Sequence, residues 1–330
     1  MKKYNKLLIT LAVLLIAAGA FVYAIGLSMG GSRNLVISKD GRVITNGGEY
    51  TGVFNMLFFS VGFQSERNSN TVYFDNPYGV PDWYFFELVD KTRVHSIEME
   101  IAVGNVTIKS GEDFSVEGKY INEEWLDMFI TNGKLFIYEK PPMGVYFTGE
   151  SRIEYIVTLP ENYRLDTVIV LTAAGKINAE NIRAENIKIE SASGGVTAAR
   201  LEADNIKIGC ASGDAEVKTL TGHTTINCSS GGIRAADING NLTVSAAMGY
   251  IEINGTILGN IDATAATGTI TFNLENDPGD FAYDIKSMNK VLVNGVNIKE
   301  SDLTDFNRKS AEYMLKVSAA TGNVALNFRD

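Results

Sequence analysis

The sequence predicts an all-β protein, a parallel β-solenoid (β-helix) with 18–19-residue coils, preceded by an N-terminal transmembrane helix. Three observations predict this fold. A glycine preceded by small residues recurs at a nearly fixed spacing, and apolar and polar residues alternate on both sides of it. An uncharged apolar run of 21 residues lies near the N-terminus. A fixed period of this size indicates an array of stacked units.

One glycine marks each unit. Six of these glycines follow one another at intervals of one coil length, and a seventh follows near the C-terminus: Gly175, Gly194, Gly213, Gly231, Gly249, Gly268 and Gly322. Five positions before each glycine stand Val170, Ile189, Ile208, Ile226, Val244, Ala263 and Val317, and two positions after stand Ile177, Val196, Ala215, Ile233, Ile251, Ile270 and Val324. This alternation is strand periodicity, and a glycine between two such runs suits a corner. Each unit should therefore be two short strands and two corners, with apolar residues stacked inward.

The N-terminal segment, residues 1–27, is interpreted as a cytoplasmic tip and a transmembrane anchor. Residues 7–27 form the apolar run, which is long enough to cross a bilayer as a helix. The lysines before it predict a cytoplasmic N-terminus, with the rest of the chain outside. A cleaved signal peptide is the alternative, because Ala18–Ala20 offers an A-x-A-like site. The retained anchor is favoured, since the apolar run continues well past that site.

Residues 28–93 are interpreted as a polar tether followed by an aromatic-rich cap. The tether is polar and glycine-rich over 28–50, whereas 51–93 is rich in Phe, Tyr and Trp. A solenoid needs its end covered, because an open coil exposes core and unpaired strand edges. The alternative is that these aromatic residues form a surface that meets the membrane or a partner.

Residues 94–330 are interpreted as the solenoid domain. Gly104 fits the repeat, but a long stretch separates it from Gly175, so antiparallel β structure at about 112–160 is inserted there. It includes Asn132-Gly133, a hairpin turn signal. After residue 273 the register loosens, and 281–298 is expected to supply one degenerate coil with Val291 and Val293 inward. The charged stretch 299–312 is expected to be a loop or short helix.

Composition excludes several functions. Thirty-nine acidic residues oppose 29 basic ones, and three of the basic residues precede the anchor, so the rest of the chain carries 26 − 39 = −13. An acidic body without a basic cluster argues against nucleic acid as a partner. No catalytic, cofactor-binding or metal-binding residue is predicted, and no cofactor. His95 and His223 have no ligand-like neighbour at sequence spacing, and the acidic residues scatter over several outward positions.

The two cysteines, Cys210 and Cys228, occupy the same repeat position in neighbouring coils, so they should stack about 4.8 Å apart. They are either two small buried residues in a ladder or a disulfide between coils. The Cα spacing permits a disulfide, although parallel side chains hold the Cβ atoms somewhat too far apart.

Several segments resemble the bacterial family named "putative adhesin" (domain of unknown function 4097). They are IEMEIAVGNVTI, IEYIVTLPENYRLDTVIVLTAAGKI, IKIESASGGV, IKIGCASGDAEV and LKVSAATGNVAL, and the resemblance covers about residues 94–330. It implies a membrane-anchored surface β-solenoid without established catalytic residues, and it implies for some members a link to envelope-stress regulation.

Taken together, the sequence predicts a non-enzymatic, membrane-anchored, extracytoplasmic β-solenoid, an adhesin or a cell-envelope binding or scaffold protein. Its expected partners are the membrane, through residues 7–27, and a cell-wall, glycan or surface-protein partner. An accessory or sensory component of an envelope-stress system is the alternative, and a glycan-active β-helix enzyme is the second alternative. Because residues 167–273 keep their pattern, specific contacts are expected at the irregular segments 51–93, 112–160 and 299–312.

Overall fold

The computed structural model describes side chains for residues 94–121, 125–140, 153–299 and 311–329, and strands β1–β5 by their backbone alone. The predicted anchor at residues 7–27 lies outside the described residues. Within the described ranges, no helix has both the length and the apolar character needed to cross a membrane. The chain divides into two compact units, Met1–Glu66 with Lys140–Gly149, and Arg67–Glu139 with Glu150–Asp330.

The first unit contains a small antiparallel sheet. Its strands are β1 (Val36–Ile37), β2 (Val43–Thr45) and β3 (Gly48–Tyr50), paired in that order.

The second unit is all-β, as predicted, with one short 3-10 helix, η3 (Pro278–Asp280), among its described residues. Its strands before the regular repeats are β4 (Tyr73–Asp75), β5 (Trp83–Glu87), β6 (Ser96–Val103), β7 (Asn105–Gly111), β8 (Ser115–Lys119), β9 (Leu126–Thr131), β10 (Lys134–Glu139) and β11 (Glu154–Pro160). The repeats follow as β12 (Arg164–Ala174), β13 (Ile177–Ser193), β14 (Val196–Ser212), β15 (Ala215–Ser230), β16 (Ile233–Asn239), β17 (Leu242–Met248), β18 (Ile251–Leu258), β19 (Ile261–Thr267) and β20 (Ile270–Leu274). The last strands are β21 (Phe281–Ser287), β22 (Val291–Val293), β23 (Val296–Ile298), β24 (Tyr313–Thr321) and β25 (Val324–Phe328).

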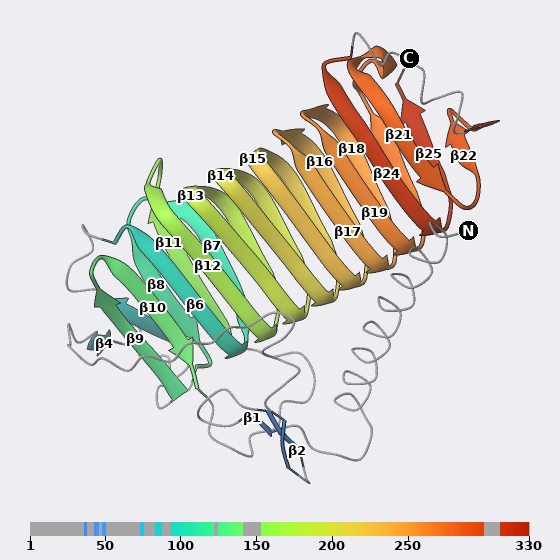
Figure 1. The fold of residues 1–330 in the computed structure, drawn as a ribbon. Helices are drawn as coiled ribbons and strands as arrows, with labels where there is room; N and C mark the ends of the chain where they lie inside the picture. Colours follow the sequence, from blue (N-terminus) through green and yellow to red (C-terminus); the bar gives the residue numbers. More distant parts are fainter. Residues whose placement is uncertain are drawn as a thin grey trace. The chain divides into compact units, whose positions relative to one another are not determined.

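Strands of successive coils pair side by side in two long ladders (Figure 1). Residues before each corner glycine form the first ladder, in the order β9–β10–β6–β12–β13–β14–β15–β17–β19–β24–β21. Residues after the glycine form the second, in the order β4–β5–β8–β11–β7–β13–β14–β15–β16–β18–β20–β25–β22–β23. Strands β13, β14 and β15 each run through a bend and pair with their neighbours on both sides of it. These three strands therefore belong to both ladders and connect them.

The register of these ladders gives the coil repeat directly. Ile189 pairs with Ile208, and Ile208 pairs with Ile226, each one coil further along the chain and in parallel register. The inward columns read from the sequence are buried in every coil, and they form one continuous apolar core. Such stacking explains why the pattern repeats: each coil buries its apolar face only against its two neighbours.

The glycine corner requires glycine because the backbones of adjacent coils touch there. Gly213 has φ +143°, and a Cβ on it would lie 2.2 Å from the carbonyl oxygen of Gly194 in the preceding coil. The prediction of two corners per coil is incomplete, because a third bend precedes the first ladder. At this bend the register shifts between Glu202 and Asn205, and Gly222 takes a φ of +126°.

At both ends of the stack, the order of the strands in space differs from their order in the sequence. The predicted insertion at about 112–160 separates the first coil from the rest in sequence only, because β12 pairs directly with β6, Val170 opposite Met99. Strands β10 and β11 lie on the other side of β6 and β7, so they cover the end of the stack. At the opposite end β24 pairs with both β19 and β21, which makes the degenerate coil of β21 and β22 the terminal one. Val291 is buried there, as predicted.

Candidate binding groove along the left-handed corner

A column of left-handed residues runs along the second ladder's far corner. Its members recur once per coil and have φ between +53° and +61°: Asn162, Asn181, Arg200, Thr219 and Asp237. Asn and Asp tolerate this region, because their short polar side chains can hydrogen-bond locally. A β-branched residue such as Thr219 is an outlier in it, and an outlier of this kind points to a local role for the side chain.

A groove of about 420 Å³ lies along this corner and crosses four successive turns. The ring of Tyr163 gives it apolar surface, whereas the Leu201 side chain beneath it is buried in the core. The Tyr163 hydroxyl donates to the Val94 carbonyl oxygen at 2.5 Å, so the ring is the part of this side chain left to face a ligand. Polar side chains complete the lining: Asn162, Asn181, Arg183, Arg200, Glu202 and Thr219.

The two arginines of the groove are fixed by neighbours in adjacent coils. Arg183 donates from Nη1 to Asn162 Oδ1 at 2.9 Å, and its Nε lies 3.1 Å from Glu202 Oε2. Arg200 donates from Nε to Asn181 Oδ1 and pairs through Nη2 with Glu180. About half of each arginine side chain is exposed, so each guanidinium is oriented while part of it faces solvent. Planar, oriented donors of this kind suit specific hydrogen bonding.

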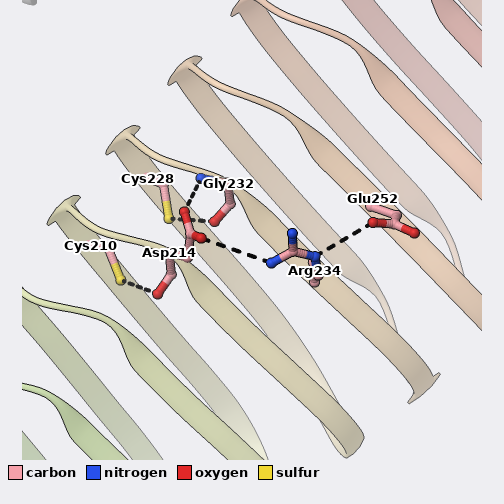
Figure 2. A network of polar contacts seen from close by, with 6 residues as sticks. All are labelled: Cys210, Asp214, Cys228, Gly232, Arg234 and Glu252. Atoms are coloured by element: carbon pink, nitrogen blue, oxygen red, sulfur yellow. Dashed lines mark hydrogen bonds and ion pairs between the residues drawn. The ribbon is translucent and has the colours of Figure 1, made fainter.

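A second polar network lies at the glycine corner (Figure 2). Arg234 stands between two carboxylates, with Nη1 at 3.9 Å from Asp214 Oδ2 and Nε at 3.6 Å from Glu252 Oε2. Asp214 Oδ1 also accepts from the Gly232 amide at 2.7 Å, which ties its coil to the next. The Arg234 guanidinium lies 4.8 Å from the centre of the Tyr250 ring. This network therefore links three coils, and each of its charged side chains faces an opposite charge.

Two of the outward carboxylates, Glu190 and Asp262, are paired with lysines. Glu190 is almost fully buried between Lys188 and Lys207, at 3.2 Å and 2.8 Å. Asp262 pairs with Lys316 at 2.5 Å in the neighbouring coil. In the part of the chain that the structure describes, no group of three His, Cys, Asp or Glu residues could hold a metal ion.

One buried carboxyl stands apart, at the covered end of the stack. Glu139 Oε2 accepts from the Val103 amide at 2.7 Å, whereas Glu139 Oε1 and the Tyr155 hydroxyl are buried without a hydrogen-bond partner in the described structure. Burial raises the pKa of Glu139 from 4.5 to about 7, although the Val103 hydrogen bond opposes this change. Burial and the Glu139 charge likewise raise the pKa of Tyr155.

His95 has contacts that its neighbours in the sequence do not show. Its Nδ1 lies 2.8 Å from Asp166 Oδ2, and its Nε2 lies 2.9 Å from the Asn132 carbonyl oxygen. Asp166 is distant from His95 in sequence, beyond the whole insertion, so spacing could not reveal the pair. The contacts join the first coil to the hairpin turn and to the second coil, which indicates a structural clamp.

The cysteines are two small buried residues in a ladder, the first of the two alternatives that the sequence allows. Cys210 and Cys228 are directly paired in register, both are buried, and both are free thiols. The hydrogen bond with Cys210, together with burial, raises the pKa of the Cys228 thiol. A thiol held protonated in this way is unreactive.

Comparison with known families decides the relationship of the chain. The model of the family described as "Toastrack DUF4097" matches residues 89–327, most of the chain. This chain belongs to the Toastrack DUF4097 family. No match was found among curated proteins.

Two solved structures share similarity with this Toastrack chain. One is a "putative adhesin" from Bacteroides fragilis, 14% identical, with a TM-score of 0.46, covering 78% of this chain and 98% of that one. The other is a "putative cell adhesion protein" from Clostridium sporogenes, 14% identical, with a TM-score of 0.26, covering 74% and 97%.

The groove of the Toastrack domain is missed by sequence reasoning, which expects specific contacts at the irregular segments. Its column carries Asn, Asn, Arg, Thr and Asp, so no shared residue type marks it. Asn or Asp at three of its five positions is a usable signal, because these residues favour the left-handed region.

Proposed function

We propose that this Toastrack protein is a non-enzymatic, membrane-anchored, extracytoplasmic β-solenoid that acts as an adhesin or cell-envelope binding scaffold. Residues 7–27 are the proposed anchor, with the N-terminus in the cytoplasm and the remainder outside. The observation that supports binding is the rigid outward surface, on which ion pairs between coils fix side chains such as Arg183 and Arg234. A surface already ordered before binding loses little entropy when a partner docks.

The charge arrangement favours an uncharged or mixed-charge partner. The groove pairs its arginines with Glu202 and Glu180, and the glycine corner pairs Arg234 with two carboxylates. Nucleic acid would need unpaired basic side chains, and the chain outside the anchor is strongly acidic. A cell-wall, glycan or surface-protein partner is therefore proposed. Because Glu190, Glu202 and Asp262 are each engaged by a basic side chain, binding is proposed over glycan hydrolysis.

The test compares cells that produce the full chain with cells that produce the chain lacking residues 28–330. Membranes carrying the full chain should retain envelope material, and membranes carrying the truncated chain should not. Equal retention by both would refute the binding role.

A component of an envelope-stress system is the second candidate. Strand β5, from the aromatic-rich segment that follows the anchor in sequence, pairs with β8, so this segment extends the second ladder. A partner at the membrane could thus be coupled to the covered end of the stack. Photo-cross-linkers at residues 54–63 should capture a lipid or membrane protein, and their failure to capture either would count against this role.

A further inference from the structure

The groove at the left-handed corner has the composition of a binding site for a neutral sugar chain. We propose that it binds a neutral oligosaccharide lying along the stack, across the four turns that contain Asn162, Asn181, Arg200 and Thr219. This inference deepens the binding role proposed above and rests on it.

The backbone provides the first argument. Arg200 and Thr219 hold φ of +53° and +57°, a region that disfavours both residue types. The same corner is occupied by Asn162 and Asn181 in the two preceding coils and by Asp237 in the next, so the fold accepts residues that suit the region better. Arg200 and Thr219 therefore keep a strained backbone at positions where Asn or Asp would fit with less strain. Retained strain of this kind indicates that the side chain has a function.

The polar groups provide the second argument. Arg183 and Arg200 are each oriented by two acceptors while part of each side chain faces solvent. Glu161 and Glu202 also line the groove, so its lining carries two positive and two negative charges. Sugar hydroxyls both donate and accept hydrogen bonds, so they match a lining that offers both in balance. A phosphate or a polyanion would find both guanidinium groups already neutralised.

The apolar surface provides the third argument. The Tyr163 hydroxyl is engaged by the Val94 carbonyl oxygen, so the ring of Tyr163 presents hydrocarbon to the groove. The lining combines this one aromatic ring with oriented polar side chains, and a volume of about 420 Å³ falls within the usual range for a small-molecule site. The C–H face of a sugar ring can pack on the Tyr163 ring while its hydroxyls reach the polar side chains that line the groove.

The test uses the full chain in detergent and measures binding by calorimetry to maltotetraose, cellotetraose and chitotetraose, with tetragalacturonate as the acidic probe. The informative variants are Arg200→Gly and Thr219→Gly, because glycine removes the side chain and relaxes the backbone. Both should keep or raise the melting temperature while at least one neutral probe binds tenfold or more weakly. Asp237→Gly is the matched control, since Asp237 has the same conformation one coil further and does not line the groove. Its affinity should equal that of the unmodified chain.

Several outcomes would overturn the proposal. They are no binding of any neutral probe at millimolar concentration, binding of tetragalacturonate alone, or equal weakening by Asp237→Gly. If the full chain retains envelope material and Arg200→Gly retains as much, the binding role stands and the groove assignment fails. If neither the full chain nor the variant retains any, both fail.

Discussion

Glu139 is the side chain whose replacement tests the energetics of the covered end most sharply. Its carboxyl is buried at the end of β10, with one oxygen accepting from the Val103 amide and the other buried near the Tyr155 hydroxyl. Glu139→Gln keeps the shape and the acceptor for Val103, and it removes the titrating proton. The substituted amide also offers donors toward the buried Tyr155 hydroxyl oxygen.

The magnitude follows from the change in pKa. Burial raises the pKa of Glu139 from 4.5 to about 7, and a difference of one in pKa corresponds to about 1.4 kcal/mol, which gives about 3 kcal/mol in total. Between pH 4.5 and 7 the folded state keeps a proton that the unfolded state has released. The free energy of unfolding therefore falls as pH rises through this window, and the contribution present below pH 4.5 is lost above pH 7.

Hydrogen exchange is the assay, because a stack of coils can open locally rather than all at once. After correction for intrinsic exchange, protection of peptides covering 96–103 and 134–139 should decline from pH 5 to pH 8 in the unmodified chain. In Glu139→Gln the decline should vanish, and protection at pH 8 should exceed that of the unmodified chain. Glu216→Gln, at an exposed position of the second ladder, should leave the decline unchanged. The same pH dependence in Glu139→Gln and the unmodified chain would refute the reasoning.

Three further predictions concern the stack itself. Gly213→Ala should destabilise the chain by about 2 kcal/mol or more, because its Cβ would collide with the Gly194 carbonyl oxygen at a φ that only glycine favours. Gly295→Ala, with φ +78° and open space around it, should cost only about 1–2 kcal/mol, and thermal unfolding that ranks the two equally would contradict this. Ellman's reagent should detect no thiol in the native chain and both Cys210 and Cys228 in the denatured, unreduced chain; no thiol after denaturation would mean a disulfide. His95→Ala should weaken the hairpin by about 1 kcal/mol or less, given the exposure of the pair with Asp166, seen as faster exchange of 126–139; unaltered exchange there would argue against the clamp.

The repeat can be read from the sequence because its cause is local and recurs. Every coil must place small or apolar residues at the same inward positions and glycine where backbones touch, so the repeat is visible in the amino-acid sequence. The columns around Gly194 and Gly213 are inward by pattern and buried in the structure, and the register between Cys210 and Cys228 follows from position alone. The order of coils at the two ends cannot be read, because β10 and β24 could pair on either side of a coil with the same alternation.

The sequence by itself therefore determined the all-β class, the coil length, the core columns and the family resemblance, since these depend on spacing along the chain. Tertiary structure alone decided which side chains from different coils meet. His95 finds Asp166 across the whole insertion, Glu139 becomes buried beside Tyr155, and Arg200 is fixed between Asn181 and Glu180. The groove exists because stacking aligns four left-handed turns, and the physical reason it escaped the sequence is that a backbone conformation, rather than a residue type, repeats there.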